Sequence, residues 1–263
     1  ATRAGDINND NLTSIGVFAS LTHGNFDATV STPNFMYNQL VEKKNGTWQY
    51  TPLKYWPNND SDKISFFAYA PYINETASSN FFVQDKESSN GFPMLSYTVP
   101  TAENKQIDFL AATPVMNQNN GNVSFKLRHT LTKINVYVKS NDDTEEKSVT
   151  FFSITGIKSG ILTYYTPTTD SDKGWLWAFP SPDKKETFTA DITNFPVPNT
   201  IAEEKKLLAT FFLLPAGKGS QFSITYQYAA KDGNNNAITQ AICIENQSLP
   251  STDTWNPGAS VSY

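Results

Sequence analysis

Two histidines and one cysteine are the residues of this 263-residue chain best suited to metal binding or nucleophilic chemistry. A zinc site needs several such ligands at short spacings, and His23, His129 and Cys243 stand far apart. His129 shares its alternation with Phe125 and Leu127, which predicts a core or strand-end position. We interpret His23 as a solvated loop residue and Cys243 as a small residue within a strand. We therefore predict no metal site and no cofactor.

Motifs of hydrolases and phosphate-binding enzymes are missing from the sequence. It has no Gly-x-Ser-x-Gly elbow and no glycine-rich phosphate loop. A glycosidase needs two carboxylates that face each other, and the acidic residues here gather in loop-like clusters. These clusters are Asp60/Asp62, Asp142/Asp143/Glu145/Glu146, Asp170/Asp172 and Glu203/Glu204. We predict that the protein is not an enzyme.

Calcium is an alternative ligand for two of these clusters. The Asp60–Asp62 and Asp170–Asp172 segments offer carboxylate oxygens, which calcium prefers. Both lack the glycine and the distal glutamate of a calcium-binding loop, so solvated turns are the better interpretation.

Four aromatic residues crowd around a polar loop: Tyr164, Tyr165, Trp175 and Trp177. Exposed rings of this kind can form a platform on which a sugar stacks, which makes a cell-surface carbohydrate-binding β-sandwich the alternative function. Core packing at the end of a domain explains the same residues, and we favour it.

Charge and composition exclude several other classes. The chain has a formal charge of -5 and no basic stripe, so we predict that it binds no nucleic acid. A single cysteine rules out an internal disulfide. The longest apolar run, near Leu207–Leu214, is too short to span a bilayer. No signal peptide is present in the sequence, and we expect any export signal to have been removed or to lie outside the given residues.

Period-two alternation indicates that strands must position these residues. Residues 222–228 alternate between large apolar and polar side chains, and residues 238–244 repeat the pattern with isoleucines. The polar turn at residues 231–236 completes a predicted β-hairpin.

Other segments give further expectations. Ile64–Tyr72 and Leu207–Leu214 are apolar in both phases, which predicts central strands covered on both faces. The apolar phase slips near Thr132, which predicts a bulge or a sharp bend. Residues 32–41 fit either a short helix or a strand and turn.

The polar segment Asn117–Asn122 divides the chain almost in the middle and has the composition of a linker. We predict an all-β protein with two β-sandwich domains in tandem, residues 1–120 and residues 121–263.

An ordered series of short segments resembles the fimbrillin family of Bacteroidales, within the type V pilin superfamily. It begins with Thr2-Arg3-Ala4 and Ile15–Phe18, and it ends with Leu213-Leu214-Pro215 and Trp255–Gly258. Between these come Asn34–Val41, Trp48–Tyr50, Lys54–Pro57, Ser65–Tyr72, Asp108–Ala111 and Phe125–His129. The series covers nearly the whole chain and keeps the order of the family.

This resemblance implies a fimbrial structural and adhesion subunit with two transthyretin-like domains. It further implies export as a lipoprotein precursor to the cell surface, in a fimbrium or at the outer membrane. By the same resemblance, a protease cleaves after Arg3, leaves Ala4 as the new N-terminus, and so triggers strand exchange with other fimbrillin-like subunits. A ligand on a host or bacterial surface is the further partner implied. A long apolar groove along a sandwich edge would favour this function over carbohydrate binding.

The lipid-bearing cysteine and first strand of the family are not within residues 1–263. The final strand that follows the position of Tyr263 in many relatives is also not within this range.

Overall fold

The computed structural model describes residues 6–84, 88–141, 145–198, 202 and 204–263. Strands hold 48% of the chain and helices 2%, which confirms the predicted all-β class. The described strands form four sheets, which we call A, B, C and D.

Sheets A and B form the first sandwich. Sheet A contains β1 (Ser14–His23), β2 (Met36–Lys44), β3 (Thr47–Gln49), β4 (Asp62–Ala70), β7 (Leu110–Ala112), β8 (Val115–Gln118) and β9 (Leu127–His129). Its order is β3-β2-β1-β4-β7-β9, with β8 also paired to β4. Sheet B contains β5 (Phe81–Val83), β6 (Met94–Thr98), β12 (Ser159–Tyr164) and β13 (Trp175–Ala178), in the order β13-β12-β6-β5. Tyr164 joins the two sheets, because its hydroxyl donates to the carbonyl oxygen of Ala68 at 2.7 Å.

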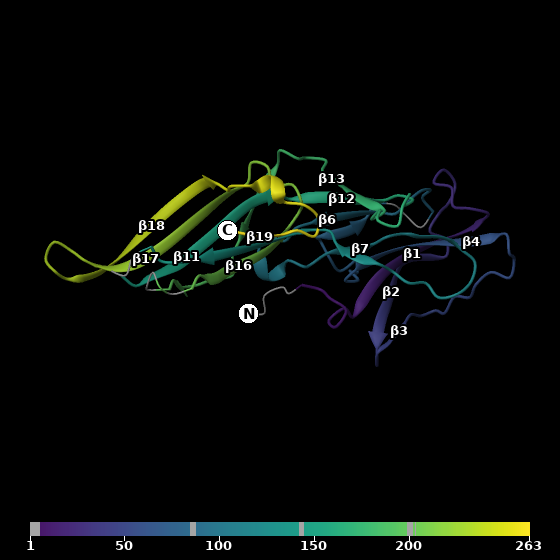
Figure 1. Ribbon diagram of the computed structural model, residues 1–263, viewed down its shortest axis with the longest axis horizontal. Coiled ribbons are helices and arrows are strands. Elements are labelled where there is room, and N and C mark those ends of the chain that lie inside the picture. The colour runs from purple at the N-terminus through teal and green to yellow at the C-terminus, as the bar shows by residue number, and fades with distance from the viewer. Residues whose placement is uncertain (1–5, 85–87, 142–144, 199–201, 203) are drawn as a thin grey trace.

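Sheets C and D form the second sandwich. Sheet C contains β11 (Lys147–Ile157), β14 (Lys185–Thr189), β15 (Phe195–Pro196), β17 (Gln221–Lys231) and β18 (Ala237–Ser248). Sheet D contains β10 (Thr132–Val138), β16 (Lys206–Leu213) and β19 (Ser260–Ser262), in the order β16-β10-β19. Two short 3-10 helices, η1 (Glu103–Lys105) and η2 (Thr252–Thr254), complete the elements. The molecule is elongated, with the β17–β18 hairpin at one end and β1 and β4 toward the other (Figure 1).

Strand pairing crosses the predicted boundary between residues 120 and 121. β9 pairs with β7 in sheet A, and β12 pairs with β6 in sheet B. One apolar cluster also runs from Phe67 in sheet A to Phe211 in sheet D. The predicted halves, residues 1–120 and 121–263, thus share sheets and a core. Whether each half folds by itself stays a prediction.

The predicted hairpin at residues 222–244 is confirmed. β17 and β18 pair in antiparallel register, with Tyr226 opposite Ile242. Asp232 fixes the turn, because its Oδ1 accepts the backbone N–H groups of Asn234 and Asn236, each at 2.8 Å. This is the local hydrogen bonding that makes aspartate and asparagine good turn residues.

The predicted bend near Thr132 is the point where the chain leaves sheet A for sheet D. β9 ends at His129, and β10 begins at Thr132. Between them the Oγ1 of Thr130 donates to the carbonyl oxygen of Phe109 at 2.5 Å. Residues 32–41, for which the sequence left helix and strand open, form coil and then β2 from Met36 onward.

The prediction of two central strands is confirmed for β4 and wrong for β16. Both are buried on both faces, but β16 stands at the edge of sheet D. Side chains close this edge, because the backbone N–H of Thr210 donates to Oε1 of Glu103 at 2.7 Å and that of Phe212 to Oε1 of Gln106 at 2.9 Å. Buried backbone donors need partners, and these two side chains replace a neighbouring strand.

Candidate strand-binding groove

Sheet A is apolar on both of its faces. Phe67 and Tyr69 point into the core shared with sheet B, whereas Val17, Ile64 and Phe66 belong to a second buried cluster. Successive residues of a strand point to opposite faces, so the continuous apolar run of β4 supplies both clusters. An antiparallel sheet in a sandwich commonly has one face in solvent. Because the outer face of sheet A is apolar, it requires a cover of its own.

Two extended segments outside the ladder lie over this outer face. Residues 50–57 contribute Tyr50 and Trp56 to the second cluster, and the segment from residue 121 to the start of β9 contributes Val123 and Phe125. The backbone groups of residues 53–57 and 122–125 form no hydrogen bond with the backbone of another described residue. The two segments therefore act as walls with main-chain groups that pair with no described backbone, although the carbonyl oxygen of Lys54 accepts the hydroxyl of Tyr50 at 3.4 Å.

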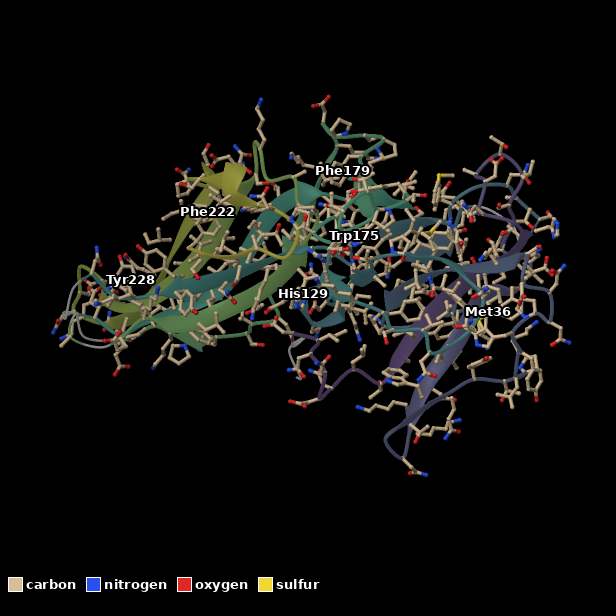
Figure 2. The ribbon with its side chains drawn as sticks, turned by 45° about the vertical axis from the view of Figure 1, so that its right-hand side comes forward. Met36, His129, Trp175, Phe179, Phe222 and Tyr228 are labelled. Atoms are coloured by element: carbon tan, nitrogen blue, oxygen red, sulfur yellow. The ribbon has the colours of Figure 1, made fainter. Side chains whose placement is uncertain are left out.

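A groove of about 970 Å³ lies between these walls. Its lining is mainly apolar and aromatic and includes Ile15, Val17, Ile64, Phe66, Trp56 and Phe125. At its rim Trp48 is 41% exposed and Tyr55 is 79% exposed. Met36 also lines the groove, far from Phe222 and Tyr228 in the second sandwich (Figure 2).

The two walls are tied together at one point. The indole Nε1 of Trp56 donates to the carbonyl oxygen of Gly121 at 3.1 Å. The same indole packs edge-on against Phe66 in the floor, with ring centroids 5.9 Å apart and planes at 77°. Trp56 thus links both walls to the floor, and Nε2 of Gln39 in β2 further ties the first segment to sheet A by donating to the carbonyl oxygen of Thr51 at 3.2 Å.

Positive charge is the second property of the groove. Lys43, Lys54 and Lys126 belong to its lining, which contains no carboxylate. The Nζ of Lys54 lies 5.6 Å from the ring centroid of Phe35. An apolar floor, main-chain groups on both walls and cationic side chains suit an extended polypeptide strand.

His129 is a strand-end histidine, one of the two positions that its alternation predicted. It closes β9, and its Nδ1 lies 2.9 Å from Oδ2 of the buried Asp108. That hydrogen bond raises the pKa of His129, and partial burial opposes the rise. His129 and Trp175 lie between the two ends of the molecule (Figure 2).

The four candidate sugar-contact residues differ in how far they are exposed to solvent. Tyr164 and Trp175 are 1% exposed and belong to the core, which is the alternative that we favoured. Trp177 is half-buried, and its Nε1 donates to the carbonyl oxygen of Thr130 at 2.9 Å. Tyr165 is also half-buried and donates to Oδ1 of Asp172. Two of the four rings thus offer no face to solvent.

In each candidate calcium segment, one carboxylate already interacts with a neighbouring group of the protein. Asp62 lies 3.0 Å from Nδ1 of His23. The hydroxyl of Tyr165 and the backbone N–H of Thr168 donate to Asp172, and these bonds lower the pKa of Asp172 to about 2. Within the described ranges, no group of three or more His, Cys, Asp and Glu side chains is placed to hold a metal ion. The residues Asp142, Asp143 and Glu203 lie outside the described residues.

The predicted processing site, Arg3 and Ala4, also lies outside the described residues. The first described residues are anchored to the junction of the two sandwiches. The backbone N–H of Ile7 donates to Oδ2 of Asp108 at 2.7 Å, and Asp6 forms an ion pair with Lys133. The chain then reaches the groove, where Leu12 is part of the lining.

Neither the lone cysteine nor the helices of the described residues add a site. Cys243 is exposed on β18, where the hydroxyl of Thr225 donates to its Sγ at 3.4 Å. In the part of the chain that the structure describes, no helix has the length and apolar character needed to cross a membrane.

Comparison with known proteins gives concordant results. The sequence matches the profile of the family described as fimbrillin-like over residues 2–263. It is 32% identical over 196 residues to the fimbrium subunit Fim1C of Phocaeicola vulgatus, an alignment that covers 68% of this chain and 51% of that protein. The chain thus spans about half the length of this curated relative.

A solved structure shares the fold. The crystal structure of a fimbrial protein from Bacteroides vulgatus superposes with a TM-score of 0.72 at 22% sequence identity. The match covers 95% of this chain and 86% of that one.

Proposed function

The chain belongs to the fimbrillin-like family, and from this membership we propose that it is a non-enzymatic structural and adhesion subunit of a bacterial fimbrium. The proposal places the protein, after export as a lipoprotein precursor, at the cell surface or outer membrane. Its partners are other subunits of the same family and a ligand on a host or bacterial surface. The name of the Phocaeicola vulgatus relative, a fimbrium subunit, supports this assignment.

We propose that the groove on sheet A receives a strand from a neighbouring subunit. The observation that carries this step is the combination of an apolar floor with two walls whose main-chain groups form no hydrogen bond with a described backbone. A strand that enters gains main-chain hydrogen bonds from the walls and apolar burial from the floor, which is β-augmentation. Burial of about five large apolar side chains at roughly 1.5–3 kcal/mol each gives on the order of 10 kcal/mol before ordering costs.

Cleavage after Arg3 is the proposed trigger. In this scheme a strand upstream of Arg3 fills the groove in the precursor, and cleavage allows its replacement. Two features support the site: the anchored segment that begins at Asp6 leads to the groove through Leu12, and the other arginine, Arg128, is half-buried in β9. A protease needs an extended substrate, and a paired strand offers one only after local unfolding.

The trigger is tested on the full-length precursor with an Arg-specific protease. Oligomers are followed by electrophoresis without boiling. We expect ladders from the wild-type precursor after cleavage, and none from the Arg3→Ala precursor under the same protease. Equal ladders from both precursors would show that cleavage at Arg3 is not the trigger.

The groove is tested by site-specific cross-linking in assembled subunits. Cys243→Ser removes the native thiol, and Ser124→Cys on one wall then carries a benzophenone probe. Ser181→Cys, an exposed position outside the groove lining, is the matched control. We expect adducts to a strand of the neighbouring subunit from position 124 and not from position 181. Adducts of equal yield from both positions would refute the groove as the assembly site.

A further inference from the structure

The groove carries a charge opposite to that of the chain. The whole protein has 25 Asp and Glu against 20 Lys and Arg. The groove lining instead has three lysines, Lys43, Lys54 and Lys126, and no carboxylate. Lys43 follows Val41 in the alternation of β2, so both side chains leave the same face of sheet A.

None of the three lysines forms an ion pair within the described part of the chain. Their neighbour on β2 behaves differently, because Lys44 pairs with Glu42 at 2.5 Å. A strand that fills the groove brings the three ammonium groups close to apolar surface. Desolvating an ammonium group without a partner is costly, so such a strand must carry the missing negative charge or leave these groups in water.

We propose that the groove selects an acidic strand: an extended peptide of alternating apolar residues with aspartate or glutamate placed to meet these lysines. This inference rests on the proposed strand-binding function and adds the chemistry of the partner. Complementary charge speeds encounter and rejects wrong partners more than it adds affinity. The three lysines thus determine which subunit strand enters.

A polypeptide explains the groove better than a fatty acid, which would also combine an apolar chain with a carboxylate. A fatty acid offers no donors or acceptors along its length. The walls at residues 53–57 and 122–125 present main-chain groups that form no backbone hydrogen bonds with described residues. A ligand with its own backbone can pair with them along its length.

The proposal is tested with three synthetic peptides and the purified chain. Each peptide has ten residues, with eight alternating valines and threonines between two terminal residues that are aspartate, asparagine or lysine. Binding is measured by calorimetry at low and at high sodium chloride. We expect the aspartate peptide to bind about 2–30-fold more tightly than the asparagine peptide at low salt, as expected for two exposed ion pairs. Salt should reduce this advantage.

Matched variants assign the effect to the groove. The triple variant K43Q/K54Q/K126Q should bind the aspartate and asparagine peptides equally. The control variant K139Q/K218Q/K231Q has the same net charge and changes three exposed lysines outside the groove lining, so it should keep the preference. All three groove lysines are exposed, and an unchanged thermal midpoint verifies that the variant is folded.

The outcomes separate this inference from the proposed function. Equal binding of all three peptides to the wild-type chain overturns charge selection and leaves the strand-binding function standing. Binding of no peptide overturns both. Binding of oleate alone, lost in K43Q/K54Q/K126Q, would identify the groove as a fatty-acid site and overturn the acidic-strand proposal.

Discussion

The Nδ1 atom of His129 lies 2.9 Å from Oδ2 of Asp108, whose side chain is only 2% exposed. The same carboxylate oxygen accepts the backbone N–H of Ile7 at 2.7 Å. One buried acid therefore holds both the end of β9 and the segment that leads from the predicted processing site to the groove.

Stability should depend on pH through His129. The hydrogen bond to Asp108 raises the pKa of His129 in the folded protein. A raised folded pKa means that protonation stabilises the protein fully below the unfolded pKa, about 6.5, and that this contribution is lost as pH rises through the folded pKa. We expect a loss below roughly 1 kcal/mol, because the ring is 45% exposed and solvent screens the pair.

This loss is measured by urea unfolding of the wild type and Asp108→Asn across that pH range, with NMR titration of the His129 ring. The asparagine keeps an acceptor for Ile7 and removes the charge. An unchanged pKa of His129 in Asp108→Asn would refute the assigned cause.

Gly16→Ala should destabilise the first sandwich. A Cβ at position 16 would lie 2.2 Å from Cε1 of Tyr69. Tyr69 is held in place, because its hydroxyl donates to Oδ1 of Asn38 at 2.7 Å and accepts the backbone N–H of Ile73. We expect a loss of about 1–3 kcal/mol in the free energy of unfolding, as for other overpacked cores.

The matched control for this change is Gly233→Ala, where an added Cβ meets no atom within 4 Å. It should change stability by less than about 0.5 kcal/mol. Chemical denaturation measures both variants, and similar losses would mean that contact with Tyr69 is not the cause.

Glu103→Ala should weaken the link between the two halves of the chain. Glu103 is fully buried, and its two carboxylate oxygens accept the backbone N–H groups of Asp191 and Thr210 at 2.9 and 2.7 Å. The alanine leaves both donors without these acceptors, at about 1–3 kcal/mol for the buried N–H of Thr210 and less for that of Asp191, an exposed residue. Glu103→Gln keeps one acceptor oxygen and should lose less. Equal losses in the two variants would indicate that side-chain volume, and not hydrogen bonding, is responsible.

The predicted division at residue 120 is tested with a fragment of residues 121–263. β12 pairs with β6, and β9 with β7, so in the fragment β12 keeps only β13 as a neighbour and β9 loses its partner. We expect it to unfold at a lower urea concentration than the same region of the whole chain, followed by the near-ultraviolet circular dichroism of its aromatic side chains. Equal midpoints would support two independent domains.

Local patterns predicted local structure well. The β17–β18 hairpin follows from period-two alternation and a turn rich in asparagine, signals that are complete within one segment. The bend near Thr132 was visible as a slip of phase, although the sequence did not reveal that it joins two sheets. The burial of β16 was predicted as well. Its edge position was not, because alternation reports which faces are covered and not which strands are neighbours.

The site was harder to predict for the same reason. Glu103 and Gln106 looked like ordinary polar residues, and only the tertiary structure places their side chains on the open edge of β16. A groove was anticipated along a sandwich edge, whereas the structure places it on the outer face of sheet A. Its signal was indirect: β4 is apolar in both phases, and the aromatic residues Trp48 and Trp56 stand in segments with little strand pattern. Neither observation shows that the loops cover the outer face of sheet A only in part.

The positions of the tryptophans make their fluorescence sensitive to what occupies the groove. Of the five in the chain, Trp48 and Trp56 line the groove, whereas Trp175 and Trp255 are buried in the core. An indole emits at longer wavelength in water than in an apolar setting, and Trp48 is 41% exposed. A strand that covers Trp48 should therefore shift its fluorescence to the blue while the core tryptophans stay unchanged. Subunit joining can thus be timed in solution with no added label.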